Sequence, residues 1–123
     1  YNFGVSQHFK LWFDLAYTDP RTNNTSTTLA GKPATLATVL GGNYGEGTPK
    51  DGWDHSTPYL TRLLQDVWGL DLRVVQRPFT LVGVNPALDQ FADLAAELKA
   101  DAETKATESG RELAELRGKA NAA

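Results

Sequence analysis

Apolar residues near the start of the chain recur with the spacing of one helical face. Counted from Val5, the spacings to Phe9, Trp12, Phe13 and Ala16 are 4, 7, 8 and 11 residues. This period predicts an amphipathic helix. Ser6 is suited to cap it, because its hydroxyl can accept from first-turn amides, and we expect the helix to end near Tyr17. Leu11 and Leu15 widen the stripe, so we expect this helix to be largely buried.

Two further apolar runs are typical of strands in a parallel sheet. Residues 34–40 carry β-branched side chains and no charge, which predicts a strand covered on both faces. Residues 72–77 form the second run. Between them, Thr57-Pro58 is a helix-start signal with Thr57 as the N-cap, and an apolar face leads from there to Gly69.

The last part of the chain predicts one more helix. Asn85-Pro86 starts it, and its apolar face continues to Leu98. Residues 99–123 are rich in Ala, Glu, Lys and Arg, which predicts a polar helical tail that faces solvent or a partner. Ser109-Gly110 is expected to break this tail. We therefore divide the chain into residues 1–98, part of one domain, and the tail 99–123.

The order of elements is helix, strand, helix, strand, helix, with a polar loop over residues 18–32. This alternation predicts an α/β fold with a doubly wound parallel sheet. Two parallel strands do not form a stable sheet alone, because each needs neighbours and cover on both faces. Tyr1 is not an initiator Met, so we expect an upstream segment of the same protein, or another chain, to supply further strands.

Composition narrows the class of protein. Of the 123 residues, 41% are hydrophobic and 22% charged, and the net charge is −3, which argues against nucleic-acid and polybasic membrane partners. No apolar run approaches the roughly 20 residues of a membrane span. The chain has no Cys, which suits the cytoplasm and excludes thiolate chemistry. His55 with Asp51 and Asp54 is a weak metal signal, so we expect no metal.

Two stretches lie where ligands bind in open α/β sheets, beyond the carboxyl ends of strands. They are Tyr1-Asn2-Phe3-Gly4, ahead of the first helix, and Leu40-Gly41-Gly42-Asn43-Tyr44-Gly45-Glu46-Gly47, after the first strand. Glycines there allow backbone amides to approach a flat ring and donate to its heteroatoms. A flexible surface connection made of turn residues is the alternative. Trp53 either lines such a ring pocket or packs against the opposing subunit.

These stretches carry a family resemblance. Tyr1-Asn2-Phe3 and the residues that follow it, as far as Asp14, resemble a segment of FMN-dependent NAD(P)H:quinone oxidoreductases and azoreductases. In that family a Tyr-Asn-Phe loop leads into a Leu-Lys-x-Trp/Tyr-x-Asp helix, and Phe9 stands here where Leu is usual. Residues 41–47 are similar to the family's Gly-Gly-x-Tyr/His flavin loop, and Thr57-Pro58-Tyr59-Leu60 resembles the start of its next helix. The likeness spans residues 1–95.

The resemblance implies a flavodoxin-like, cytoplasmic homodimer, of which this chain is the C-terminal portion. In that family, FMN is reduced by NADH or NADPH and reoxidised by a quinone, an azo compound or a similar small acceptor. The residues that its motifs place against the flavin ring are Tyr1, Asn2, Phe3, Gly4, Leu40, Gly41, Gly42 and Asn43. Tyr44 matches a Tyr or His near the reacting edge, which implies a catalytic hydrogen bond to a flavin or substrate oxygen.

Two departures from the family matter. Leu40 stands where a polar or charged residue often lies, so one hydrogen bond to the ring is not expected. The family's Ser-rich phosphate-binding loop follows its first strand, and no such loop precedes Tyr1. We therefore expect the 123-residue chain alone to bind FMN poorly. The alternative to an enzyme is a non-catalytic fragment or assembly module that completes its sheet with another chain.

Overall fold

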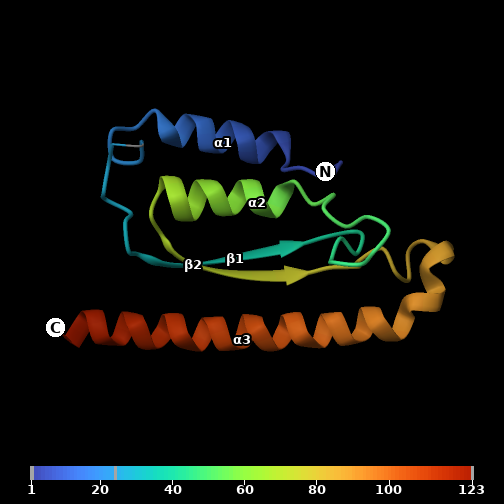
Figure 1. Ribbon diagram of the computed structural model, residues 1–123. Helices are drawn as coiled ribbons and strands as arrows, with labels where there is room; N and C mark the ends of the chain where they lie inside the picture. Colours follow the sequence, from blue (N-terminus) through green and yellow to red (C-terminus); the bar gives the residue numbers. More distant parts are fainter. Residues whose placement is uncertain (1, 24, 123) are drawn as a thin grey trace. The chain divides into compact units, whose positions relative to one another are not determined.

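In the computed structural model, which describes residues 2–23 and 25–122, the elements follow the predicted order (Figure 1). The helices and strands are α1 (Gln7–Tyr17), β1 (Pro33–Val39), α2 (Ser56–Thr61), β2 (Asp71–Arg77) and α3 (Ala92–Ala122). A π-helical segment, η1 (Arg62–Val67), continues α2, and a 3-10 segment, η2 (Pro86–Phe91), leads into α3. β1 and β2 are neighbouring parallel strands. The predicted α/β alternation is confirmed.

The chain folds as two compact units. Unit 1 comprises Tyr1–Ala34 and Gly52–Leu72, and unit 2 comprises Thr35–Asp51 and Arg73–Ala123. Unit 1 therefore holds α1, α2 and η1, whereas unit 2 holds the greater part of both strands together with α3. Each of the two candidate ligand-binding stretches falls within one unit.

The two helix starts of unit 1 are capped by different kinds of side chain. The Ser6 hydroxyl accepts from the amide of Phe9 at 3.1 Å, which confirms the predicted cap. The prediction that Thr57 caps α2 is wrong, because that helix begins at Ser56. The Asp54 carboxylate accepts from the amides of Ser56 and Thr57 at 2.9 and 3.0 Å, so this carboxylate fixes the earlier start.

The core of unit 1 is aromatic. Phe13 and Trp68 are buried, with ring centroids 4.8 Å apart, and Trp12 meets Trp68 edge-on at 5.9 Å. The prediction that α1 is largely buried is wrong, since Leu11, Trp12 and Leu15 are 59%, 53% and 63% exposed. The ring contacts gather on the Phe13 side of α1, and the described residues leave the other part of its apolar stripe uncovered.

η1 is not readable from the apolar pattern. The amide of Trp68 donates to the carbonyl of Leu63, and that of Leu70 to the carbonyl of Leu64, both at 3.0 Å. These bonds span five and six residues, wider than the four of an α-helix. The indole N–H of Trp68 donates to the Thr22 carbonyl at 2.6 Å. η1 ends at Val67 with Trp68 as its C-cap, and the next residue, Gly69, where the sequence predicts that the helix stops, has a φ of +68° that suits glycine.

The approach to α3 begins where the sequence predicts. The Asn85 side chain accepts from the amide of Ala87 at 3.1 Å, which confirms a helix start at Asn85-Pro86. The first turns are 3-10 rather than α. None of the helices in the described part of the chain combines the length and the apolar character needed to cross a bilayer.

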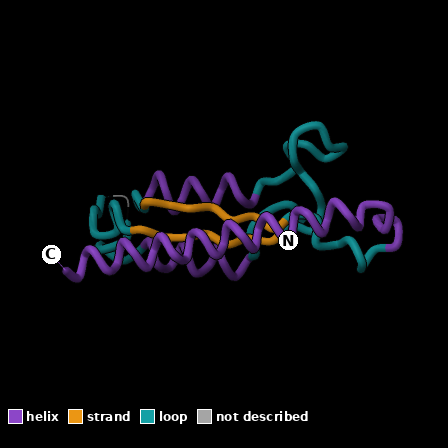
Figure 2. Tube along the Cα trace, turned by 90° about the horizontal axis from the view of Figure 1, so that it is seen from below, coloured by secondary structure: helices purple, strands orange, loops and turns teal. Residues whose placement is uncertain are grey.

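α3 runs along the two strands within unit 2 (Figure 2). Its buried positions are Ala95, Ala102 and Ser109. The Ser109 and Thr35 hydroxyls share a hydrogen bond, so Ser109 has a partner on β1 and does not compete for its own helix backbone. The predicted break at Ser109-Gly110 is therefore wrong, and α3 continues to Ala122. The division of the chain at residue 98 stays a prediction.

Candidate functional site

The loop after β1, residues 40–47, is here called the glycine loop, and its backbone is held by the segment after β2. The carbonyls of residues 40–42 accept hydrogen bonds from the amides of residues 79–81, at 3.1 Å in each case. The Leu40 amide donates to the Arg77 carbonyl at 2.9 Å, which extends the strand pairing by one residue. The carbonyls of residues 40–42 are therefore all hydrogen-bonded within unit 2.

The amides of the glycine loop are used differently. In the part of the chain that the structure describes, the backbone amides of Gly41, Gly42 and Asn43 are paired with no acceptor. All three residues are half-buried, and amides in such places ordinarily have a partner. A row of unpaired donors at the carboxyl end of a parallel strand suits the polar edge of a ligand.

Neither Gly41 nor Gly42 adopts a positive φ, so close neighbours rather than backbone conformation favour glycine at both positions. A Cβ on Gly42 would lie 3.0 Å from the ring of Tyr44, and a Cβ on Gly41 would lie 3.1 Å from a terminal methyl of Leu81. The Tyr44 ring therefore lies against the backbone of Gly42, and the missing side chain allows this contact. Its hydroxyl is held beside the unpaired amides as a result.

The Asn43 side chain serves the loop itself. Its Oδ1 accepts from the Gly45 amide at 3.2 Å, and its backbone carbonyl accepts from the Thr48 hydroxyl at 3.1 Å. The groups that Asn43 offers to a ligand are therefore its amide and its side-chain nitrogen.

The segment after β2 contains two residues, Thr80 and Leu81, that the sequence analysis missed. Thr80 donates through its hydroxyl to the Leu40 carbonyl at 3.2 Å, and Leu81 sets the space at Gly41. Phe79 is buried with φ of +65°, and its ring lies 5.3 Å from that of Phe91. Because parallel strands end at one edge of a sheet, the strand bounds indicate that this segment lies near the glycine loop. The strand bounds do not indicate which side chain contacts which glycine.

The other candidate stretch forms a strained turn in unit 1. Asn2 and Phe3, here called the Asn2–Phe3 turn, have φ of +50° and +67°, which is uncommon for residues other than glycine. The Phe3 carbonyl accepts from the His55 amide at 2.9 Å. The Phe3 ring meets the Trp53 ring edge-on, with centroids 5.3 Å apart and planes at 84°. Trp53 therefore contacts an aromatic ring of its own chain, and its two predicted roles, lining a ring pocket or packing against the opposing subunit, stay predictions.

The structure brings the predicted residues together as two sets. Leu40, the glycines and Tyr44 lie with residues 77–81 in unit 2, and the Asn2–Phe3 turn with Gly4 lies near residues 53–55 in unit 1. Tyr1 lies outside the described residues. The binding of one ligand by both sets stays a prediction. Among residues 2–23 and 25–122, no three His, Asp or Glu side chains gather as a metal ion would require.

Two ion pairs shift the pKa values of their carboxylates. Arg21 donates to Asp19 from its side chain and its backbone amide, and these bonds lower the pKa of Asp19 to about 2. Arg73 on β2 donates two hydrogen bonds, of 2.6 and 2.7 Å, to the carboxylate of Glu112 on α3. These bonds lower the pKa of Glu112. The second pair joins the sheet of unit 2 to its helix.

A groove with a volume of about 300 Å³ lies between the strands and α3 within unit 2. Its lining is mostly apolar and comprises Ala37, Thr38, Val39, Val75, Arg77, Lys99, Ala102, Glu103 and Ala106. Such a lining offers few polar groups to orient a ligand. The glycine loop, with its unpaired amides, is the better candidate site.

Comparison with known proteins adds independent information. The family model described as flavodoxin-like fold matches residues 1–106. The chain is 41% identical over 105 residues to an FMN-dependent NADH:quinone oxidoreductase of Frankia casuarinae, covering 83% of this chain and 50% of the relative. Proteins of the same name are 36% identical over 107 residues in Frankia alni (85% and 51% covered) and 31% identical over 116 residues in Streptomyces avermitilis (94% and 54% covered). The chain thus spans about half the length of the curated relatives it matches.

Proposed function

The chain belongs to the flavodoxin-like fold family, and on that basis we propose that its parent protein is an FMN-dependent oxidoreductase that carries electrons from NADH to a quinone. The observation that carries the proposal is the row of unpaired amides from Gly41 to Asn43 at the carboxyl end of β1. In open α/β sheets, ligands bind at this edge. The names of the relatives from Frankia and Streptomyces support the choice of cofactor, donor and acceptor.

The residues of the glycine loop fit a flat, polar ring. Gly41 and Gly42 have no Cβ to hold a ring away from the backbone, and the amides of residues 41–43 can donate to its heteroatoms. Leu40 contributes an apolar side chain, because its carbonyl is already bonded to Thr80. The Asn2–Phe3 turn, with Tyr1 and Gly4, would contact the same ring. The chemistry that FMN supplies when bound is two-electron transfer from nicotinamide to acceptor.

We assign the catalytic role to Tyr44. Its phenol can donate a hydrogen bond to an oxygen on which negative charge develops, and such a donor acts best when it is fixed in advance. The contact of its ring with Gly42 provides that fixation.

The proposal extends to the finer properties of the parent protein. We include NADPH as an alternative donor and azo compounds as acceptors, and we propose a cytoplasmic homodimer whose upstream segment supplies further strands and the phosphate contacts. The exposed Leu11, Trp12 and Leu15 on α1 favour association with such protein. The lack of Cys suits the cytoplasm.

A non-catalytic assembly module is the second candidate, favoured by the same exposed residues on α1. The two candidates differ in one property that is easily seen. An assembly module would carry no flavin, whereas the oxidoreductase would be purified with one or would take one up.

The experiment that tests the proposal is titration of the full protein with FMN, followed by NADH oxidation with a quinone. We expect saturable binding of one FMN per chain and turnover that requires it. The 123-residue chain titrated in parallel should bind FMN far more weakly, because the phosphate contacts are assigned to the upstream segment. Full protein that binds no FMN, or that turns over without it, would refute the proposal.

A further inference from the structure

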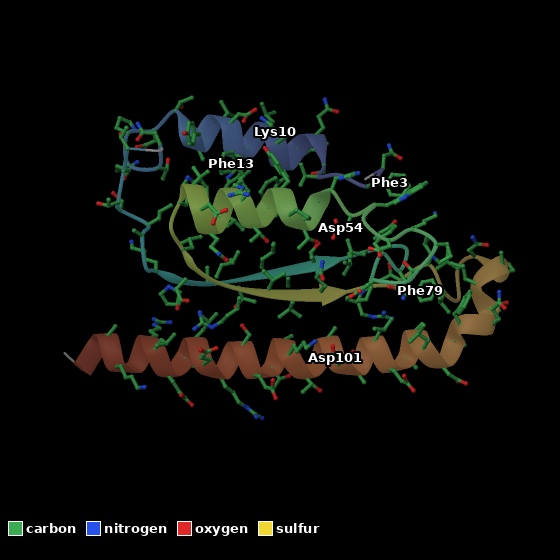
Figure 3. The ribbon with its side chains drawn as sticks, viewed as in Figure 1. Phe3, Lys10, Phe13, Asp54, Phe79 and Asp101 are labelled. Atoms are coloured by element: carbon green, nitrogen blue, oxygen red, sulfur yellow. The ribbon has the colours of Figure 1, made fainter. Side chains whose placement is uncertain are left out.

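The short segment before α2, residues 53–55, makes both described contacts with the Asn2–Phe3 turn. The His55 amide donates to the Phe3 carbonyl at 2.9 Å, and the Trp53 ring lies edge-on to the Phe3 ring at 5.3 Å. Figure 3 shows Phe3 and Asp54 beyond the same end of α2. All of these residues belong to unit 1, so the contacts lie within one compact body.

The turn needs such contacts because its backbone is strained. Asn2 and Phe3 both have left-handed φ values, +50° and +67°. For a residue as bulky as Phe this conformation costs on the order of 1–2 kcal/mol. Strain of this kind persists only where the surroundings hold the chain in place. Here the hold includes the hydrogen bond from the His55 amide and the contact with the Trp53 ring.

The segment that provides the hold is itself anchored to α2. Gly52, with φ of +75°, ends the preceding turn and sets the direction of the segment. The Asp54 carboxylate then binds the first amides of α2, at Ser56 and Thr57. Trp53 and His55 flank Asp54, so their positions follow from that of the helix. The position of α2 therefore determines that of Phe3, through the contacts that Trp53 and His55 make with it.

We propose that Trp53 is a positioning residue for the Asn2–Phe3 turn. It acts by holding the Phe3 ring, and through it the left-handed backbone that is to contact the flavin; this last step rests on the proposed function. Trp53 is 48% exposed and Phe3 is 39% exposed, so the pair is open on one side. An edge-to-face contact of this geometry is directional, which fixes the orientation of Phe3 as well as its depth.

The test compares Trp53→Ala with Trp53→Phe in the full protein, using hydrogen exchange of the His55 amide and FMN affinity as readouts. Trp53→Ala removes the ring, so we expect faster exchange at His55 and FMN binding weaker by about threefold to tenfold. Trp53→Phe keeps an aromatic edge and should restore most of both. Val84→Ala, which removes an apolar side chain that is 74% exposed, is the control and should alter neither.

The outcomes separate this inference from the proposed function. Unchanged exchange at His55 in Trp53→Ala would overturn the inference, whatever happens to FMN. Faster exchange with unchanged FMN affinity would also overturn it, because the turn would then be held without positioning anything for the flavin. If the unaltered protein binds no FMN, the proposed function fails, and the His55 exchange still shows whether Trp53 holds the turn.

Discussion

The glycine loop of unit 2 and the Asn2–Phe3 turn of unit 1 differ in what constrains their backbone. The glycine loop has ordinary φ values at Gly41 and Gly42, and its glycines are needed because Tyr44 and Leu81 come so close. The turn has left-handed φ values at Asn2 and Phe3, two residues that carry side chains. One region is limited by space and the other by backbone strain.

This difference teaches where each region is vulnerable. Three carbonyls of the glycine loop are bonded to residues 79–81, and these hydrogen bonds fix its backbone. An added side-chain atom is therefore the change that should destabilise this loop. The turn is strained and its hold includes a backbone hydrogen bond and a ring contact, so the loss of such a contact should destabilise it. Adding atoms to the first region and removing atoms near the second should therefore give separate effects.

The largest effect is expected from Gly42→Ala. The new Cβ would lie 3.0 Å from the Tyr44 ring, so the ring must move away from the loop. Overpacking of this kind costs about 1–3 kcal/mol, and we expect FMN affinity to fall by about tenfold or more, with a further loss of turnover. Isothermal titration and steady-state kinetics on the full protein measure both quantities.

Gly110→Ala is the matched control for this change. A Cβ at Gly110 meets nothing within 4 Å, and alanine is the better helix former. The control should therefore bind FMN as before and unfold at the same or a slightly higher temperature. Equal FMN affinity in Gly42→Ala and the unaltered protein would remove the spatial explanation for Gly42.

An intermediate effect is expected from Asp54→Ala, which acts on the side of the turn. The substitution removes the acceptor for the amides of Ser56 and Thr57, and lost caps cost about 1 kcal/mol. We expect a lower free energy of unfolding in a denaturant titration. Hydrogen exchange should rise at the start of α2 and stay unchanged in the glycine loop. Asp66→Ala, which removes an exposed partner of Arg62, should have a smaller effect on stability.

The smallest effect is expected from Glu112→Gln, which tests how much unit 2 depends on its helix. Arg73 lowers the pKa of Glu112 in the folded protein, so the ion pair adds stability above the ordinary carboxylate pKa. That contribution is lost as the pH falls through the lowered folded pKa. The free energy of unfolding of the unaltered protein should therefore fall more on acidification than that of Glu112→Gln. Glu115→Gln, which removes a charge from the same helix, should follow the unaltered protein.

Much of the fold was predictable because apolar periods report directly on helices and strands. α1 and both strands lie within a residue or so of the predicted bounds, and the Ser6 cap was readable from its place before the stripe. The start of α2 was missed because Thr57-Pro58 is a strong local signal and the Asp54 carboxylate outcompetes it. The continuity of α3 was missed because the partner of Ser109 lies on a distant strand.

The candidate site was predictable in part for the same reason. The strand that ends at Val39 indicates where the glycines must lie, and their number signals close approach. The unpaired amides, by contrast, lie in a segment whose carbonyls, at residues 40–42, are bonded to residues 79–81. That pairing depends on how two strand ends meet, and no spacing along the chain encodes it. The backbone strain at Phe3 could not be predicted from the sequence either, because nothing in a Tyr-Asn-Phe sequence demands a left-handed backbone.

The π-helical turns of η1 bear on how this chain can change in length. Each residue of an α-helix rotates the next by about 100°, so a deletion within α1 would turn Phe13 away from Trp68. A π-helical turn holds a surplus residue, and η1 lies directly ahead of Trp68. Removing one residue between Arg62 and Val67 can tighten the segment into an ordinary helix while leaving Leu60 and Trp68 facing the same way. Length differences among related chains should therefore collect in this segment and spare α1.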